Sequence, residues 1–293
     1  MMKKILMLSF LSAFLFSCSS DDDGVGGSVD QSDYFPVTQN AMWFYNFNQS
    51  LQGNNNSGNT IIDINGSTMI EGEAYQILDN TTYLIGSMNQ VFFKKNLNKE
   101  VTIRPMVDVF NEFVDFGDMR FIQNSMQPNA VLVESEAQLV GDAMPIPENE
   151  SGITGTVTPT TYITIRNRHI NKTNNMTVNS MSYQGITHQR MEYDIKMVLD
   201  IQAIVEVGGE SIPLNRQHEL VEQQQYGTLD LFLAKDVGII KTDYDYSFND
   251  LNLTTNISLG GISIDIADFA PEVLNFNNAL DMRGAASIND FTF

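Results

Sequence analysis

Residues Met191 to Val207 read MEYDIKMVLDIQAIVEV, and this stretch decides the fold. Apolar side chains occupy every second position, and most of the positions between them carry charged or amide groups. A helix would spread those charges over both of its faces, whereas a strand places alternate residues on opposite faces. The seventeen residues therefore predict a strand much longer than the usual five or six.

Turn signals extend this strand into an antiparallel meander. Gly208-Gly209 predicts a two-residue hairpin turn, and Gly260-Gly261 predicts a second one. Between the two turns, alternating apolar runs at 229–233 and 240–248 predict strands with one dry face. We therefore predict an all-β protein with one large curved antiparallel sheet, a half-barrel or a sandwich-like meander, that has room for one or two short helices.

Other stretches are less regular, and they set the predicted domain boundaries. Residues 107–116 combine helical spacing with the β-branched and aromatic content of a strand, and both interpretations stay open. A proline-rich break at 144–159 is interpreted as a long loop rather than a linker. We expect a single antiparallel β domain over 33–270, followed by a peripheral C-terminal segment, 271–293, with a short helix at 272–280.

The N-terminus indicates export and lipidation. Residues 1–17 have two lysines followed by an apolar run that is shorter than the ~20 residues of a membrane span, as in a signal peptide. Leu15-Phe16-Ser17-Cys18 resembles a bacterial lipobox, which implies that Cys18 is lipidated and anchors the chain in a membrane. Residues 18–32 form an acidic Gly/Ser tether whose Asp21-Asp22-Asp23 run resembles the surface-export signal of Bacteroidota lipoproteins. We expect an outer-membrane protein exposed at the cell surface, with the periplasmic leaflet as the alternative.

Charge and cysteine content narrow the possible partners. The formal charge is −20, and removal of 1–17, which holds two lysines and no acid, makes it −22. Such an acidic chain is not expected to bind nucleic acid or a lipid surface through a basic patch. Cys18 is the single cysteine, so the folded part has no disulfide and depends on core packing.

Two short segments resemble parts of known lipoproteins. The segment DYFPVTQNAMWFY at 33–45 is similar to the opening of many Bacteroidota lipoprotein domains, with Trp43 and Tyr45 at the aromatic positions and Asn40 in place of the usual glycine. FLAKDVGIIK at 232–241 is similar to a late hairpin of the same domains. The resemblance implies the curved half-barrel of lipoprotein-carrier-like proteins. We predict a left-handed turn at Asn40, which asparagine tolerates, and a first strand with Trp43 and Tyr45 in the core.

No pattern of residues points to catalysis. The three histidines, His169, His188 and His218, lack metal-ligand spacing, and Cys18 is the only cysteine. Neither a nucleophile elbow nor a calcium loop occurs, and no carboxylate pair is singled out by spacing. We therefore expect no cofactor, no metal and no enzymatic activity.

One set of residues is a candidate ligand site. With a two-residue turn at Gly208-Gly209, Arg216 lies opposite Ile201 and His218 lies opposite Leu199, on the apolar face. Buried charge is costly. Either a bulge near Pro213 turns these side chains away, which we favour, or the face lines a wet cavity. In a cavity, Arg216 and His218 would contact the polar head of a ligand, and the apolar side chains of Met197, Leu199 and Ile201 would contact the rest.

Two functional hypotheses follow. The first is a non-enzymatic envelope lipoprotein that binds a lipid or other apolar ligand on the concave, methionine-rich face of its sheet, because methionine surfaces adapt to varied apolar ligands. The alternative is a structural or adhesion lipoprotein that binds a protein or glycan through its outer face and loops. The sequence does not specify the ligand or the protein partner.

Overall fold

The computed structural model describes residues 32–38, 40–85, 90–109, 112–123, 127–146, 153–247, 252–259, 262–265 and 281–293. The predicted signal peptide, Cys18, the tether up to residue 31 and the predicted helix at 272–280 lie outside these residues.

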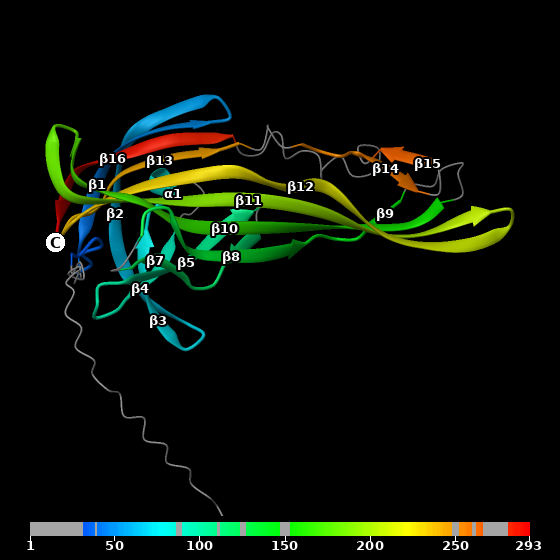
Figure 1. Cartoon of the computed structure of the whole chain (residues 1–293), viewed down its shortest axis with the longest axis horizontal. Coiled ribbons are helices and arrows are strands. Elements are labelled where there is room, and N and C mark those ends of the chain that lie inside the picture. Colours follow the sequence, from blue (N-terminus) through cyan, green and yellow to red (C-terminus); the bar gives the residue numbers. More distant parts are fainter. Residues whose placement is uncertain are drawn as a thin grey trace, which may run out of the picture.

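The predicted all-β class is confirmed. Strands make up 78% and helix 1% of the structure, and fourteen strands form one antiparallel sheet that does not close (Figure 1). In chain order they are β1 (Met42–Leu51), β2 (Asn54–Ile70), β3 (Glu73–Asp79), β4 (Val91–Lys95), β5 (Val101–Val109), β6 (Glu112–Asp115), β7 (Met119–Ile122), β8 (Ala130–Val140), β9 (Met144–Pro145), β10 (Ile153–Val178), β11 (Met181–Val207), β12 (Glu210–Ala234), β13 (Gly238–Tyr246) and β16 (Met282–Thr292).

The neighbours in the sheet follow the order β6-β5-β4-β3-β2-β1-β16-β13-β12-β11-β10-β8, with β7 beside β5 and β9 beside β10. A separate hairpin pairs β14 (Asn256–Leu259) with β15 (Ile262–Asp265), as the second glycine turn predicts. The described helix α1 (Thr82–Ile85) has one turn, and no helix within the described ranges is long and apolar enough to cross a bilayer.

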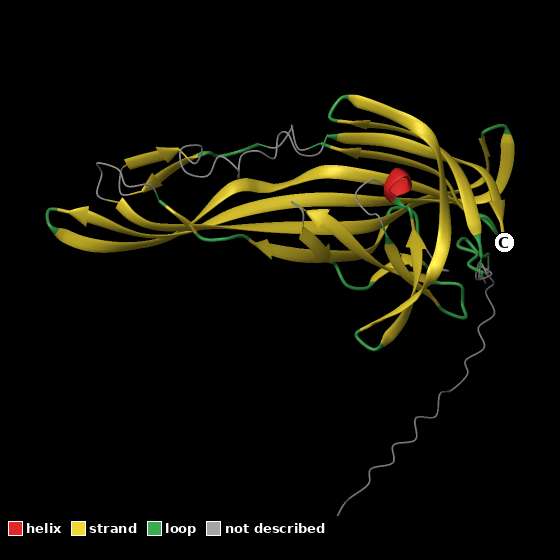
Figure 2. Cartoon of the chain, turned by 180° about the vertical axis from the view of Figure 1, so that it is seen from behind, coloured by secondary structure: helices red, strands yellow, loops and turns green. Residues whose placement is uncertain are grey.

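The predicted long strand is confirmed as part of β11, which has 27 residues. Its partners β10 and β12 are almost as long, and the three run the length of the molecule (Figures 1 and 2). The turn after β11 has Gly208 and Gly209 at φ 63° and 88°, and Val207 pairs with Glu210. Two successive positive φ angles are typical of the tight hairpin turn that the sequence predicts.

The long strands pass through two regions that we name the body and the arm. The arm consists of residues 153–161, 197–207 and 210–221 of β10, β11 and β12, with β9. The body consists of the remainder of these strands with β1–β8, β13, β16 and α1. Three register shifts in the β11–β12 pairing, between Tyr193 and Val198, separate the two regions. Such shifts bend a strand and increase its twist, and β12 bends visibly there (Figure 1).

The body holds an apolar core on one side of the sheet. We call this side the inner face; on β11 it carries Met191, Tyr193 and Ile195, all buried. The opposite, outer face carries Glu192 and Asp194. The two ends of the sheet meet through side chains, because Asn167 Nδ2 on β10 donates to the carbonyl oxygens of Arg120 and Phe121 on β7 at 2.9 and 3.2 Å.

The two segments that resemble lipoprotein domains contact each other in this core. Trp43 and Tyr45 are each 2% exposed, as predicted, and Asn40 has the predicted positive φ, 74°. Trp43 Nε1 donates to the Val237 carbonyl oxygen at 2.7 Å, and the Tyr45 hydroxyl donates to that of Ile239 at 2.6 Å. These bonds fix the first strand to the turn between β12 and β13.

Two sequence interpretations are now decided by strand pairing. Residues 107–116 contain the end of β5 and all of β6, which pair with each other, so residues 107–109 and 112–115 of this stretch are strand. The prediction that 271–293 is peripheral is wrong for its described part, because β16 lies between β1 and β13 in the sheet. The sequence did not indicate this strand because several of its residues are glycine or alanine. A Cβ at Gly284 would lie 2.3 Å from the Tyr244 hydroxyl, so the tyrosine ring fills the space that a side chain at this position would take.

The predicted break at 144–159 lies within the sheet. Met144 and Pro145 of β9 pair with Val157 and Thr156 of β10, and residues 147–152 between the two strands lie outside the described ranges.

Candidate functional site

The expected bulge near Pro213 is wrong. The hairpin register continues without a shift from the turn to Val198 and Glu219, so Arg216 does lie opposite Ile201 and His218 opposite Leu199. Pro213 is tolerated because β13 pairs with β12 only as far as Gly227, which leaves this stretch of β12 at an edge of the sheet.

The structure brings the five predicted ligand-site residues together but gives their polar groups other partners. Met197, Leu199 and Ile201 are 2%, 0% and 1% exposed. Arg216 Nη1 donates to the Ser258 carbonyl oxygen at 2.8 Å, and His218 Nε2 lies 3.0 Å from that of Thr254. Both side chains therefore contact the segment 252–259 that runs beside β12.

An enclosed cavity in the body is small. It lies between β4, β5, β11 and β12, it is lined by apolar side chains such as Phe93, Met191 and Leu229, and it measures about 30 Å³. Ligand pockets usually have ~300–1,000 Å³, and ~30 Å³ is the share of one water molecule in the liquid. This cavity cannot hold an acyl chain.

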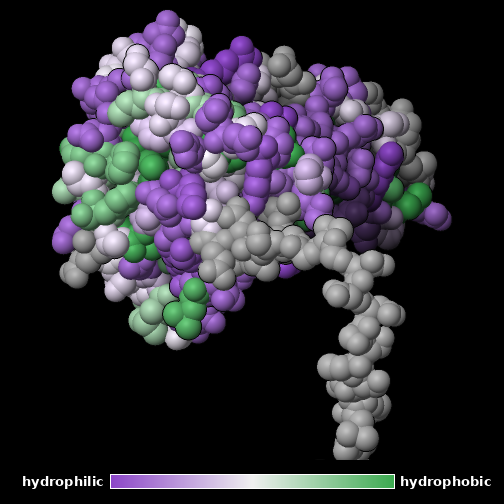
Figure 3. Space-filling model, turned by 60° about the vertical axis from the view of Figure 1, so that its left-hand side comes forward, coloured by the Kyte–Doolittle hydropathy of each residue, from purple (hydrophilic) through white to green (hydrophobic). Residues whose placement is uncertain are grey.

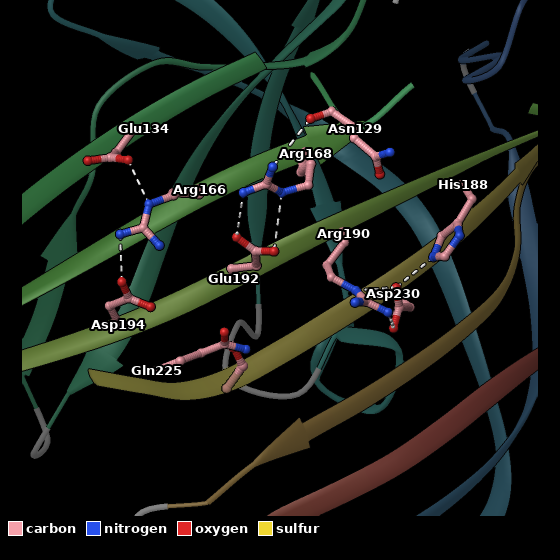
Figure 4. A network of polar contacts seen from close by, with 11 residues as sticks. Asn129, Glu134, Arg166, Arg168, His188, Arg190, Glu192, Asp194, Gln225 and Asp230 are labelled. Atoms are coloured by element: carbon pink, nitrogen blue, oxygen red, sulfur yellow. Dashed lines mark hydrogen bonds and ion pairs between the residues drawn. The ribbon is translucent and has the colours of Figure 1, made fainter. Parts of the chain in front are cut away.

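The outer face of the body carries a network of paired charges (Figure 4). Arg166 donates to Glu134 and to Asp194, each at 2.6 Å, and Arg168 lies 3.2 Å from Glu192. The hydrogen bond that Arg166 donates to Asp194 is the main reason that the pKa of Arg166 is raised. Each of these arginines has a carboxylate partner on a neighbouring strand.

The same network continues on β11 and β12. Asp230 accepts a hydrogen bond from Arg190 Nε at 2.8 Å and lies 2.6 Å from His188 Nε2. Burial opposes ionisation of Asp230, but its bonds to His188 and Arg190 outweigh this effect and hold its pKa below the usual value. The His188 ring also stacks on Phe232, with 4.3 Å between the ring centroids. In this network, Arg190 and His188 thus share Asp230 as their acidic partner.

The three histidines do not converge. His169 lies in the inner face, 1% exposed and 3.3 Å from the Thr187 hydroxyl, and burial, with Lys172 and His188 nearby, lowers its pKa to about 4. His188 lies in the outer face of the body and His218 in the arm. Among the described residues, no group of three His, Cys, Asp or Glu side chains is arranged to hold a metal ion.

A groove that the sequence analysis did not identify crosses the arm. It measures about 550 Å³ and is open to solvent. Its ten lining residues come from β8, β10, β11 and β12: Gln138, Val140, Thr158, Thr160, Asp200, Ile201, Gln202, Asn215, Arg216 and Gln217. Strand pairing places eight of them on the outer face. The other two, Ile201 and Arg216, alternate with these residues along β11 and β12 and therefore belong to the inner face.

The polar groups of the groove are available to a ligand. Gln217 Nε2 donates to Asp200 Oδ1 at 2.7 Å. Within the described ranges, no hydrogen bond occupies the side chains of Gln138, Thr158, Gln202 and Asn215. The feature of the sequence that could have indicated this groove is the alternation of threonines along β10, at Thr154, Thr156, Thr158 and Thr160. From the sequence, this face of the strand can be predicted only to be exposed to solvent, because the alternation does not show where the sheet bends.

Comparison with known proteins gives no family. No protein-family model and no curated protein matches the chain. Among solved structures, it is similar to a candidate exported protein with a YmcC-like fold from Bacteroides fragilis, with 8% identity and a TM-score of 0.37, over 89% of this chain and 100% of the other. It is also similar to a candidate lipoprotein from Parabacteroides distasonis, with 10% identity and a TM-score of 0.27, over 90% and 100%. Similarity at this level carries no argument about the function of this chain.

Proposed function

We propose that this protein is a non-enzymatic lipoprotein of the cell envelope, anchored through Cys18, that binds a glycan chain in the groove of the arm. The lipobox supports the membrane anchor. The sizes of the groove in the arm and of the cavity in the body support the groove as the ligand site. The groove measures about 550 Å³, within the usual range of ligand sites, whereas the enclosed body cavity measures about 30 Å³.

The lining of the groove supports a hydroxyl-rich ligand. Amide side chains both donate and accept hydrogen bonds, and the threonine hydroxyls do the same. Gln138, Thr158, Gln202 and Asn215 present such groups from four neighbouring strands, and none of these groups is occupied within the described chain. A sugar chain offers alternating hydroxyl donors and acceptors that match this lining.

The position of the groove supports presentation away from the membrane. The Asp33 carbonyl oxygen accepts from the Asp236 amide, so the described chain begins at the body end of the long strands. From Ile186, near that end, to Val207 at the tip, β11 spans roughly 70 Å, at ~3.3 Å per residue. An anchor that leads into Asp33 would leave the arm free to project. We propose that the arm is exposed at the surface of the outer membrane.

Titration calorimetry tests the groove as a glycan site. The mature lipidated protein in detergent would be titrated with neutral cello-, xylo- and N-acetylchito-oligosaccharides. Thr158→Trp should abolish binding, because Thr158 lies in the groove floor. Thr177→Trp, a matched change at an exposed position on the body end of β10, should leave binding intact. Equal binding by both variants, or no binding by the unmodified protein, would contradict the proposal.

A second candidate is an apolar ligand at Met197, Leu199 and Ile201, with its polar head at Arg216 and His218. The observation in its favour is that the structure does bring these five residues together, and both polar groups bond to backbone carbonyl oxygens. A ligand here would have to take the place of the segment 252–259. Uptake of a fluorescent fatty acid, weakened in Arg216→Ala, would support this candidate, and absence of uptake would exclude it.

A further inference from the structure

We infer that the groove selects amino-substituted, positively charged glycans over neutral and acidic ones; this inference rests on the proposed function. It starts from Asp200, the one carboxylate in the lining. Its hydrogen-bond partner is the neutral amide of Gln217, and among the described residues it forms no ion pair with a lysine or arginine. The carboxylates in the network of the body, in contrast, each have a basic partner.

The surroundings of Asp200 contain little positive charge. In the arm, Asp200, Glu206, Glu210 and Glu219 are acidic, and Arg216 is the one arginine or lysine. Although Arg216 borders the groove, its guanidinium group donates to the Ser258 carbonyl oxygen. Lys196, just outside the arm, is held by Glu219 at 2.7 Å. The arm therefore carries four acidic side chains and one arginine, and strand pairing places Asp200 on the outer face and the positively charged Arg216 on the inner face.

A ligand that suits this site carries both hydroxyl groups and a cation. The free amide and hydroxyl side chains bind the hydroxyl groups, and the carboxylate of Asp200 accepts a charge-assisted hydrogen bond from a protonated amine. An N-acetylated sugar cannot supply that cation, and a uronic acid is repelled. An exposed charge pair is worth up to ~1 kcal/mol, which corresponds to a preference of roughly fivefold.

Calorimetry with three probes of equal length tests the inference. The probes are glucosamine hexasaccharide at mildly acidic pH, its fully N-acetylated form, and a hexagalacturonate. We expect the amine form to bind roughly fivefold more tightly than the acetylated form, and the uronate more weakly than either. The preference should decrease at ~1 M salt, where the screening length falls to ~3 Å.

Two matched variants separate a local contact from the general charge of the arm. Asp200→Asn should remove the preference, so that the amine form binds no more tightly than the acetylated form. Glu206→Gln removes the same charge from the same strand outside the groove and should keep the preference. A preference that is lost in Glu206→Gln as well, or kept in Asp200→Asn, overturns the inference.

The experiments distinguish an error in the selection for amines from an error in the proposed glycan site. If all three probes bind equally and Thr158→Trp abolishes their binding, the selection for amines is wrong and the glycan site stands. If none binds, both are wrong. Binding of oligolysine with no binding of any sugar would make the occupant a cationic peptide and would also overturn both.

Discussion

The body and the arm share the three long strands β10, β11 and β12, yet the polar side chains on their outer faces differ in how they are paired. In the body, Arg166, Arg168 and Arg190 each bond to carboxylates on neighbouring strands (Figure 4). In the arm, the corresponding positions carry amides, hydroxyls and Asp200, and most of these groups have no partner in the described chain. The alternation of residues in a β-strand determines which side chains lie on the outer face. Whether these side chains have partners on neighbouring strands then determines whether the outer face stabilises the sheet or is free to bind a ligand.

Buried and exposed apolar side chains occur in both regions. The core on the inner face includes Ile165 of the body and Leu199 of the arm, and hydrophilic residues cover much of the side of the body seen in Figure 3. Exposed apolar side chains include Met69 in the body and Ile204 in the arm. The following substitutions compare positions in the two regions that differ in burial or in pairing.

The largest effect is expected from truncation of isoleucines. Ile165 in the body is 0% exposed, and Ile204 in the arm is 46% exposed. Ile165→Ala should lower the free energy of unfolding by ~2–5 kcal/mol, because it removes buried apolar contacts and leaves a cavity. Ile204→Ala should cost less than ~1 kcal/mol. Urea unfolding measures both, and similar losses would mean that the outer face of the arm at Ile204 is packed as tightly as the inner face of the body.

A pH effect should appear in the body alone. Because the pKa of His169 is lowered from 6.5 to about 4, the unfolded chain binds more protons than the folded one between these values. Stability should therefore decrease as the pH falls from ~6.5 to ~4, by up to ~3 kcal/mol. His169→Asn should flatten this part of the curve. The carboxylates with lowered pKa, Asp115 and Asp230, act below this window. An unchanged slope in His169→Asn would contradict the assignment.

Glycine substitutions should give a smaller contrast between turns. Gly238 in the body has φ 102°, and an added Cβ would lie 3.1 Å from Trp43 Nε1; Gly209 at the tip of the arm has φ 88° with open space around it. Gly238→Ala combines backbone strain with a clash and should cost ~2 kcal/mol, whereas Gly209→Ala should cost ~1 kcal/mol. Emission from Trp43, the single tryptophan, should change only in Gly238→Ala. A shift in both variants would show that the tip is coupled to the body.

The smallest contrast concerns the two aspartates of the outer face. Asp194→Asn breaks a partly buried bond to Arg166 and should cost ~1 kcal/mol. Asp200→Asn removes an acidic group with no ion-pair partner in the described chain and should be close to neutral. Thermal unfolding of the two variants measures the difference. A large loss in Asp200→Asn would indicate that Asp200 stabilises the arm.

Local rules explain what the sequence could predict. The alternation from Met191 to Val207, the glycine pair at 208–209 and the aromatic residues Trp43 and Tyr45 each depend on neighbouring residues, and each prediction is confirmed. The central position of β16 was missed, because its glycine and alanine residues are complemented by distant aromatic rings such as Tyr244.

The candidate site could not be predicted from the sequence, because it depends on the geometry of the sheet. The face of Met197, Leu199 and Ile201 could be identified, but its contacts with the segment 252–259 depend on a chain connection that pattern does not reveal. The groove lies next to three register shifts near Tyr193 to Val198, and no residue in that run of the sequence indicates them.

Cysteine footprinting tests most directly whether the ligand site lies on the outer face of the arm. Cys18 is the single cysteine and would be blocked by the proposed lipidation, so Thr158→Cys and Thr177→Cys each add one reactive thiol, in the groove and on the body end of the same strand. With saturating glucosamine hexasaccharide, alkylation at position 158 should slow strongly and alkylation at position 177 should not change. Protection at 177, or none at 158 while the sugar is bound, would place the site elsewhere.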